Sequence, residues 1–427
     1  MYPRKPQIDY TDSSGPEQNS SQLRRGWLAP FSSLRNRHYR WLWLGIFFFV
    51  HGMQMQSVAG GWLVYTMTDS AWALGVVTSG WGIPLIVFSL FGGTIADRVR
   101  KRNLLMVSQI AACLVTLVIT ILITTDRIAL WHLFVSSMLF GVIFAFVMPA
   151  RQAFIMELVG KEDMPNAIAL GAIAMNICRI ASPAIAGILL KLIGIPGVYW
   201  LIVITYGIVV ATTFMIPPGG TMIARPDVPM MEDLMQGVKY VRGNIIILTL
   251  LMMAFIPILV AMPYQMLMPV FARSVFQAGE TGLGLLMSAV GGGALFGSAL
   301  IASLGNFKRK GVLMLLAGII FGIALILFGL SKALLPAFFC LLFVGAGSSM
   351  FMTLANTLLM DNTPEELIGR VMSIYIMTFG LMPLGMLPAG ALAEAFGAPF
   401  TVGVGGFILT LFLIVISISQ PGVRRLR

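Results

Sequence analysis

One charged side chain lies deep inside a long apolar stretch of the sequence. It is Arg179, in the run from 165 to 190, with Asn176 three residues before it and Pro183 four residues after it. At these spacings the three residues share one face of a helix. A lone guanidinium is costly in hydrocarbon, so we expect Arg179 to face a bundle interior or a water-filled cavity. There it would act in substrate binding or ion coupling, or brace the bundle by binding neighbouring carbonyl groups.

Other polar residues in apolar runs could line the same cavity. His51 and Gln54 lie three residues apart in the first run, so an imidazole that can titrate and an amide can share one helical face. Later runs contribute four weaker candidates, Tyr264, Gln265, Asn356 and Tyr375. Each of these residues could instead form hydrogen bonds between helices, the usual role of polar groups in a membrane, and one histidine alone does not make a proton pathway.

The sequence contains no cluster of residues that would suit an enzyme active site. None of the 17 acidic residues falls in the middle of an apolar run, the three histidines are scattered, and Cys113, Cys178 and Cys340 have no partner at metal or disulfide spacing. We therefore expect no catalytic residues, no metal and no cofactor. The glycine-rich phosphate loop of an ATP-driven pump is also absent from the sequence. Any proton coupling would have to use His51 or one of three carboxylates near helix ends, Asp97, Glu157 or Glu394.

The elements that must position these residues are membrane helices. Of 427 residues, 58% are hydrophobic and 11% are charged, which leaves too little polar surface for a water-soluble globule. The net charge of +11 does not indicate a nucleic-acid partner, because the basic residues fall in short clusters between apolar runs. A helix that spans the bilayer needs about 20 apolar residues, since its backbone groups must be satisfied within the segment.

Twelve such runs predict an all-α integral membrane protein with twelve transmembrane helices in two pseudo-symmetric six-helix bundles. In the first half they cover 41–66, 72–95, 103–124, 131–154, 165–190 and 197–216, and in the second half 245–271, 282–303, 311–331, 335–358, 369–393 and 399–418. The two halves also show a weak internal repeat, because residues 150–163 align with residues 354–367 at the ends of the fourth and tenth runs.

The distribution of basic residues predicts the orientation. Of the 28 lysines and arginines, only Arg127, Lys191, Arg273 and Lys332 fall in the loops that would lie outside, and only Arg179 falls within a run. Since such residues accumulate in cytoplasmic loops, both termini should be cytoplasmic. The predicted organisation is a cytoplasmic tail (1–40), an N-terminal bundle (41–216), a cytoplasmic linker with an amphipathic helix (217–244), a C-terminal bundle (245–418) and a basic tail (419–427).

The loop between the second and third runs carries a recognisable motif. GGTIADRVRKRNLL resembles the loop signature of the major facilitator superfamily, with Arg100 where that family usually has glycine; the matching residues are Gly93, Ile95, Ala96, Asp97, Arg98, Lys101, Arg102 and Leu105. A short glycine-containing turn brings two helices together, and Asp97 can pair with a nearby arginine. We hypothesise a cytoplasmic latch made by Gly93, Asp97, Arg98, Arg102 and Glu157. The alternative is that these charges only fix the topology.

Further segments resemble one branch of that superfamily, the transmembrane secretion effectors, which include siderophore exporters. They are NRHYRWLWLG, GGWLVYTMTDSAWALG, WHLFVSSMLFG, PARQAFIMELVGKEDMPNAIAL and NICRIASPAIAG. Residues 182–187, SPAIAG, are similar to the family's antiporter signature, in which Gly-Pro is often followed by two glycines. Pro183 and Gly187 match that signature, whereas Ser182 and Ala186 replace glycines.

The resemblance implies a secondary active transporter that works by alternating access in the inner membrane. We expect a proton-coupled antiporter that exports bulky amphiphilic small molecules such as drugs or siderophores. Its partners would be that small molecule, membrane lipid and protons, and the protein would be a monomer. The 29 methionines suit an adaptable apolar cavity, although they serve equally well in packing. An importer of a small nutrient and a membrane sensor without transport remain as alternatives.

Overall fold

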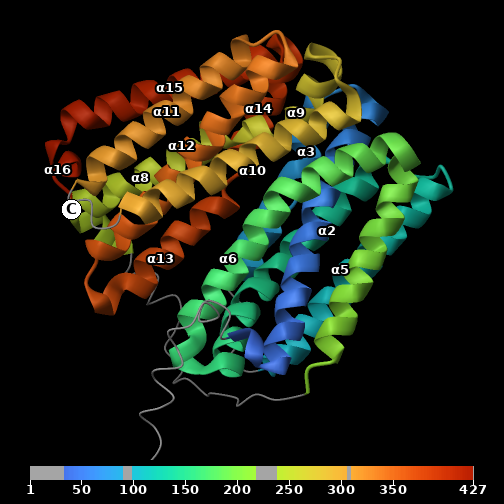
Figure 1. Cartoon of the computed structure of the whole chain (residues 1–427). Helices are drawn as coiled ribbons and strands as arrows, with labels where there is room; N and C mark the ends of the chain where they lie inside the picture. The colour runs from blue at the N-terminus through green and yellow to red at the C-terminus, as the bar shows by residue number, and fades with distance from the viewer. Residues whose placement is uncertain (1–32, 90–98, 218–237, 305–308, 427) are drawn as a thin grey trace, which may run out of the picture.

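A computed structural model describes residues 33–89, 99–217, 238–304 and 309–426 of the chain (Figure 1). These residues form helices and contain no strand. Eleven of the helices in the described ranges are long and apolar enough to cross a membrane, and one of them, Asp163–Phe214, contains two spans. The prediction of twelve transmembrane helices is therefore confirmed.

The first six spans form the N-terminal bundle. The first is α2 (Arg37–Thr68), the second begins with α3 (Ala71–Ser79) and runs to Ser89, and the third is α5 (Lys101–Thr124). The next three are joined in α6 (Leu130–Phe214), whose helical backbone is interrupted at Gly160 and at Gly194. Both glycines have a positive φ, 73° and 70°, a backbone conformation that residues other than glycine rarely adopt. They separate the fourth span from the fifth (163–193) and the fifth from the sixth (195–214).

The last six spans form the C-terminal bundle. The seventh, Ile245–Val275, consists of α8 (Ile245–Val260), η3 (Met262–Gln265), α9 (Met268–Val270) and η4 (Phe271–Val275). The eighth to tenth are α10 (Gly279–Leu304), α11 (Lys310–Leu330) and α12 (Leu334–Asp361). The eleventh comprises α13 (Glu365–Gly380) and α14 (Pro383–Phe396), the twelfth is α15 (Ala398–Ser419), and α16 (Pro421–Arg424) follows it.

Three spans at the boundary between the bundles are broken, where the sequence predicted continuous helices. The second changes direction at Gly80–Trp81, the seventh between 260 and 268, and the eleventh at Leu381–Met382. Proline explains two of the breaks, because Pro263, Pro269 and Pro383 cannot donate the backbone hydrogen bond that a helix interior needs. Of the predicted linker helix, only residues 238–243 are described, and they are helical.

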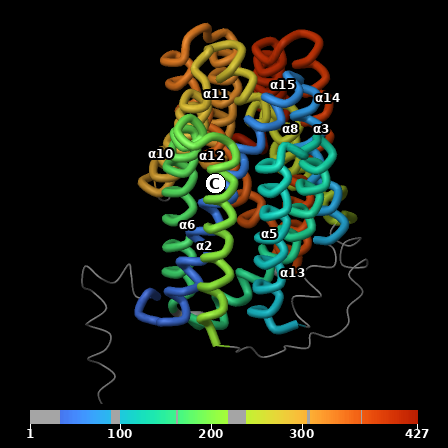
Figure 2. Tube along the Cα trace, turned by 90° about the vertical axis from the view of Figure 1, so that its right-hand side faces the viewer, coloured from blue at the N-terminus to red at the C-terminus, as the bar shows by residue number. Residues whose placement is uncertain are grey.

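The two bundles are in contact at one end and diverge toward the other. Figure 1 shows α9, α14 and α3 together at the contacting end, and the tube in Figure 2 shows the two bundles from the side. We call the end that carries Asp69, Arg273 and Glu394 the outer end, and the opposite end the inner end, after the predicted orientation. Apolar side chains such as Leu192 and Phe214 cover the outside of the bundles, as a lipid-facing surface requires.

Candidate substrate site and outer gate

Arg179 lies at the middle of the fifth span, on the face turned away from lipid. Ile173, Ile177 and Ile188 are each 48% exposed and mark the lipid-facing side of this helix. Arg179 follows Ile177 by two residues, a rotation of about 200° around a helix with 3.6 residues per turn. Its side chain therefore leaves the opposite side of the helix, as predicted for a charge inside a membrane bundle.

The eighth span packs directly against this face. Gly291 of α10 lies so close to the Arg179 carbonyl that a side chain at Gly291 would overlap with it. The Ser288 hydroxyl donates a hydrogen bond of 2.7 Å to the carbonyl oxygen of Ile180. Arg179 is thus at the boundary between the two bundles, and it is close enough to Tyr264 of the C-terminal bundle to interact with it electrostatically.

Burial changes along this face of the fifth span, and Arg179 marks the change. Toward the outer end, Ser182 and Ala186 are fully buried at 0% exposure. At Arg179 and toward the inner end, at Met175 and Ala172, the same face is exposed. The bundles therefore enclose this helix on its outer half and leave it accessible on its inner half.

The antiporter-like motif lies in the enclosed half and contacts both bundles. The His51 imidazole nitrogen Nδ1 is 2.7 Å from the Ser182 hydroxyl, so the structure joins two residues that the sequence proposed for different roles. Across the boundary, a side chain added at Gly284 would come within 2.5 Å of the Pro183 carbonyl oxygen and 3.0 Å of the Gly187 Cα. Small residues on both helices thus permit close approach of the fifth and eighth spans.

The remaining cavity candidates form separate groups. Tyr264 and Gln265 lie in the broken part of the seventh span, where the Gln265 amide donates a 3.5 Å hydrogen bond to the Tyr264 hydroxyl. Tyr264 is 2% exposed, whereas Gln265 is exposed. Tyr375 interacts with Asn356. Two further candidates, Gln54 and Asn176 of the N-terminal bundle, are half-buried. Gln56, which the sequence analysis did not propose, accepts a 3.0 Å hydrogen bond from the Tyr206 hydroxyl.

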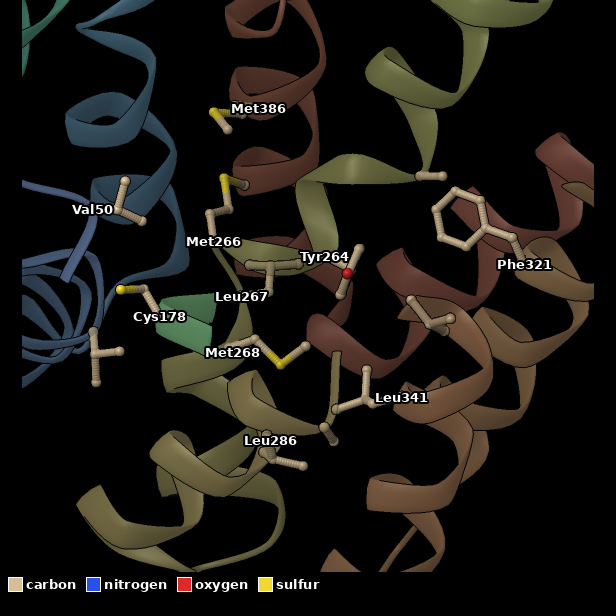
Figure 3. Close-up of a cluster of buried hydrophobic side chains, with 14 of the residues drawn as sticks. Val50, Cys178, Tyr264, Met266, Leu267, Met268, Leu286, Phe321, Leu341 and Met386 are labelled. Carbon is tan, nitrogen blue, oxygen red and sulfur yellow. The ribbon is translucent and has the colours of Figure 1, made fainter. Parts of the chain in front are cut away.

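An apolar cluster fills the boundary at the same depth as these polar groups. Figure 3 shows Val50 and Cys178 of the N-terminal bundle opposite Met266, Leu267 and Met268 of the broken seventh span. All five side chains are at most 5% exposed and belong to one continuous core. The cluster thus packs the first and fifth spans against the broken seventh span near mid-membrane.

Polar contacts join the two bundles at the outer end. The Glu394 carboxylate accepts hydrogen bonds from Ser70 Oγ (3.1 Å), Ala71 N (2.7 Å) and Trp72 N (3.2 Å), at the start of α3 in the other bundle. Helix N-termini attract carboxylates because their amide groups are unpaired and carry partial positive charge. This contact could not be predicted from the sequence, because Glu394 and the start of α3 lie more than 320 residues apart in the chain.

The first and seventh spans are joined at the same end. The Tyr65 hydroxyl lies 2.7 Å from the Ser274 hydroxyl, and Arg273 Nη1 donates to the Tyr65 carbonyl oxygen at 3.3 Å. The Arg273 guanidinium also lies 5.6 Å from the centre of the Tyr65 ring and 3.8 Å from Asp69. We call the contacts made by Tyr65, Asp69, Arg273, Ser274 and Glu394 the outer gate.

The proposed cytoplasmic latch is described only in part. Gly93, Asp97 and Arg98 lie outside the described residues. Arg102 donates a 3.0 Å hydrogen bond to the carbonyl oxygen of Phe214 and lies 5.9 Å from its ring, at the inner end of the sixth span. Glu157 is exposed and forms no ion pair with Arg102. The latch therefore stays a prediction, with Arg102 attached to the sixth span.

Sequence comparison identifies the family. Residues 28–423 match the sequence profile of the transmembrane secretion effectors. The chain belongs to this family. The match covers all twelve spans, and it confirms the resemblance that the motifs in the first half indicated. The transmembrane secretion effectors are transporters of the major facilitator superfamily, so this protein is a multi-pass membrane transporter of small molecules.

Individual relatives agree with this assignment. The staphyloferrin A transporter of Staphylococcus aureus is 26% identical over 360 residues, which cover 83% of this chain and 89% of the relative. The enterobactin exporter EntS of Shigella dysenteriae is 26% identical over 367 residues, which cover 82% of this chain and 84% of the relative.

Among solved structures, a POT family transporter bound to 5-aminolevulinic acid superimposes with a TM-score of 0.73 at 12% identity, over 91% of this chain and 97% of that one. The nucleoside transporter NupG gives 0.69 at 12% identity over 90% and 98%. These structures support the fold alone.

Proposed function

We propose that this transmembrane secretion effector is a secondary active exporter of the inner membrane. It would carry bulky amphiphilic molecules, such as drugs or siderophores, from the cytoplasm by alternating access. The observation that carries the proposal is the fifth span, whose boundary face is buried outward from Arg179 and exposed inward from it. In this arrangement a cytoplasmic molecule has access to the polar groups at mid-membrane, while the outer gate blocks release.

The relatives support export of a siderophore-like molecule. One is named for staphyloferrin A and another for enterobactin, and the second is named as an exporter. The broken seventh and eleventh spans fit this role, because transporters of related folds place discontinuous helices around a site at the bilayer midplane. Tyr264 and Gln265, with Tyr375 and Asn356, would then line the site from the C-terminal bundle.

Export requires the outer gate to open and the inner end to close. The outer contacts of the boundary are suited to such rocking, because they include small residues in close approach, a few hydrogen bonds and one exposed ion pair. Exposed ion pairs contribute only about 0–1 kcal/mol, so the gate can open at modest cost. For coupling we favour Glu394 and His51, since each joins two elements across a helix boundary and each can bind a proton.

The test uses the purified full chain in liposomes with an imposed pH gradient and a pH-sensitive dye inside. Catecholate siderophores and lipophilic cations are added in turn. We expect proton movement that depends on the added molecule, together with movement of that molecule against the proton gradient. Substrate movement along the proton gradient would identify an importer instead. No proton movement with any compound would overturn the coupled mechanism.

A further inference from the structure

We infer that the substrate carries a negative charge and that Arg179 is its counter-ion. The inference rests on the proposed function and narrows it to a chemical class: amphiphilic anions whose carboxylate or phenolate lies beside an apolar body. Arg179 would thereby determine specificity by charge.

The first step is that the described part of the chain supplies no charge partner for Arg179. The two ion pairs found among the described residues join Arg273 with Asp69 and Lys310 with Asp361. Within its own span the nearest carboxylate toward the inner end is that of Asp163, sixteen residues away and therefore about 24 Å along the helix. No acidic residue of the sequence lies in the middle of any span. Among the described residues, the positive charge at mid-membrane depth is thus not compensated by an acidic side chain.

The second step excludes the bracing role that the sequence left open. A structural arginine would donate to carbonyl groups of neighbouring helices. In the described part of the chain the Arg179 side chain makes no hydrogen bond, while its own carbonyl is packed against Gly291. The residue as a whole is exposed. Its guanidinium is therefore available to a ligand in the accessible inner half of the boundary.

The third step follows from alternating access. When the inner end closes, water around Arg179 is displaced, and an unpaired guanidinium in that enclosed space would be strongly disfavoured. An anionic substrate would remove this penalty, whereas a cationic one would double the buried charge. A carboxylate is especially suited, since guanidinium can bind it through two parallel hydrogen bonds.

The groups across the boundary suit the rest of such a molecule. Tyr264 is within electrostatic range of Arg179, and Gln265 beside it is exposed and has both a donor and an acceptor. Met175, 36% exposed on the Arg179 face, offers an adaptable apolar surface. The site thus combines one cation, a few polar groups and flexible apolar contacts.

The experiment compares two xanthene dyes of similar shape and opposite charge. Carboxyfluorescein is the anion and rhodamine 6G is the cation, and binding of each to the full chain in nanodiscs is followed by fluorescence anisotropy. We expect carboxyfluorescein to bind at least about tenfold more tightly than rhodamine 6G. Only the anionic dye can form a charge-assisted hydrogen bond with Arg179, and one such bond accounts for a difference of this size. Equal binding, a preference for rhodamine 6G or no binding of carboxyfluorescein would overturn the inference.

Variants separate charge from structure. Arg179→Gln should lose this preference, Arg179→Lys should keep part of it, and Arg179→Glu should favour rhodamine 6G. The matched control is Arg127→Gln, which removes the same charge from an exposed loop at the outer end and should bind both dyes like the unmodified protein. An unchanged preference in Arg179→Gln would contradict the assignment. Because binding needs no flux, anion binding without export would count against the proposed function and not against this inference.

Discussion

The Glu394 carboxylate, in the last turns of α14, accepts a 2.7 Å hydrogen bond from the backbone amide of Ala71, the first residue of α3. This contact crosses from one bundle to the other. Since the same oxygen also accepts from Ser70 Oγ and Trp72 N, one side chain of the eleventh span holds the start of the second. Opening of the outer end must break all three bonds.

The substitution Glu394→Gln should therefore shift the protein toward an outward-open state. The amide keeps one acceptor oxygen but loses the charge that favours a helix N-terminus. Because Glu394 is exposed, we expect a loss of about 1 kcal/mol, or about fivefold in the equilibrium between the two states.

Distances between spin labels at the outer end would measure this shift. Met67→Cys and Phe396→Cys place labels on exposed positions of the first and eleventh spans, after Cys113, Cys178 and Cys340 have been replaced. Asp126→Asn is the control, since it removes a charge from an exposed loop within one bundle. An unaltered distance distribution in Glu394→Gln would argue against a role in the gate.

The Tyr65→Phe substitution should weaken the same gate less than Tyr65→Ala. Phenylalanine loses the 2.7 Å hydrogen bond to Ser274 but keeps a ring beneath the Arg273 guanidinium, whereas alanine loses both. The same pair of spin labels would rank the two variants. Equal effects would mean that the ring contact with Arg273 does not hold the gate closed.

The Gly284→Leu substitution should prevent closure of the outer end. A side chain there would collide with the Pro183 carbonyl and the Gly187 backbone, so the fifth and eighth spans could not approach. We expect export to fall at least about tenfold because the protein remains outward-open, as overpacking a rigid contact costs about 1–3 kcal/mol. Gly207→Leu is the control, because no atom lies within 4 Å of a Cβ built there. Normal export by Gly284→Leu would show that the two spans need not touch.

His51 and Ser182 should be energetically coupled. Hydrogen bonds between membrane helices contribute about 0.6 kcal/mol on average and up to about 1.7 kcal/mol. A double-mutant cycle with His51→Gln and Ser182→Ala, followed by thermal unfolding in detergent, should give a coupling energy in that range. The comparison cycle pairs His51→Gln with Thr116→Ala, whose hydroxyl donates a hydrogen bond to Ala112 O in its own helix. If both cycles are additive, the 2.7 Å contact does not stabilise the protein.

The sequence predicted those features that depend on local composition. Apolar runs bounded by charges place all twelve spans, since a run of about 20 apolar residues has few alternatives to crossing the bilayer. The lone charge at Arg179 predicted the face of its helix, because burial in lipid is so costly. Both arguments need only neighbouring residues in the chain.

Features that depend on contacts between distant segments could not be predicted. The partnership of Glu394 with α3 and that of His51 with Ser182 arise only when the helices pack. The break in the seventh span is an intermediate case. Pro257, Pro263 and Pro269 recur at intervals of six residues, and this spacing could have indicated an interrupted helix around Tyr264.

The turns at Gly160 and Gly194 have a mechanical consequence. Each connects two long helices with almost no intervening chain, so the fifth span is tethered at both ends and has little freedom to slide past the fourth and sixth. Arg179 therefore keeps a fixed position within a rigid three-helix unit. The broken seventh and eleventh spans of the C-terminal bundle would supply most of the bending, and Arg179 would stay in place while these spans move around the substrate.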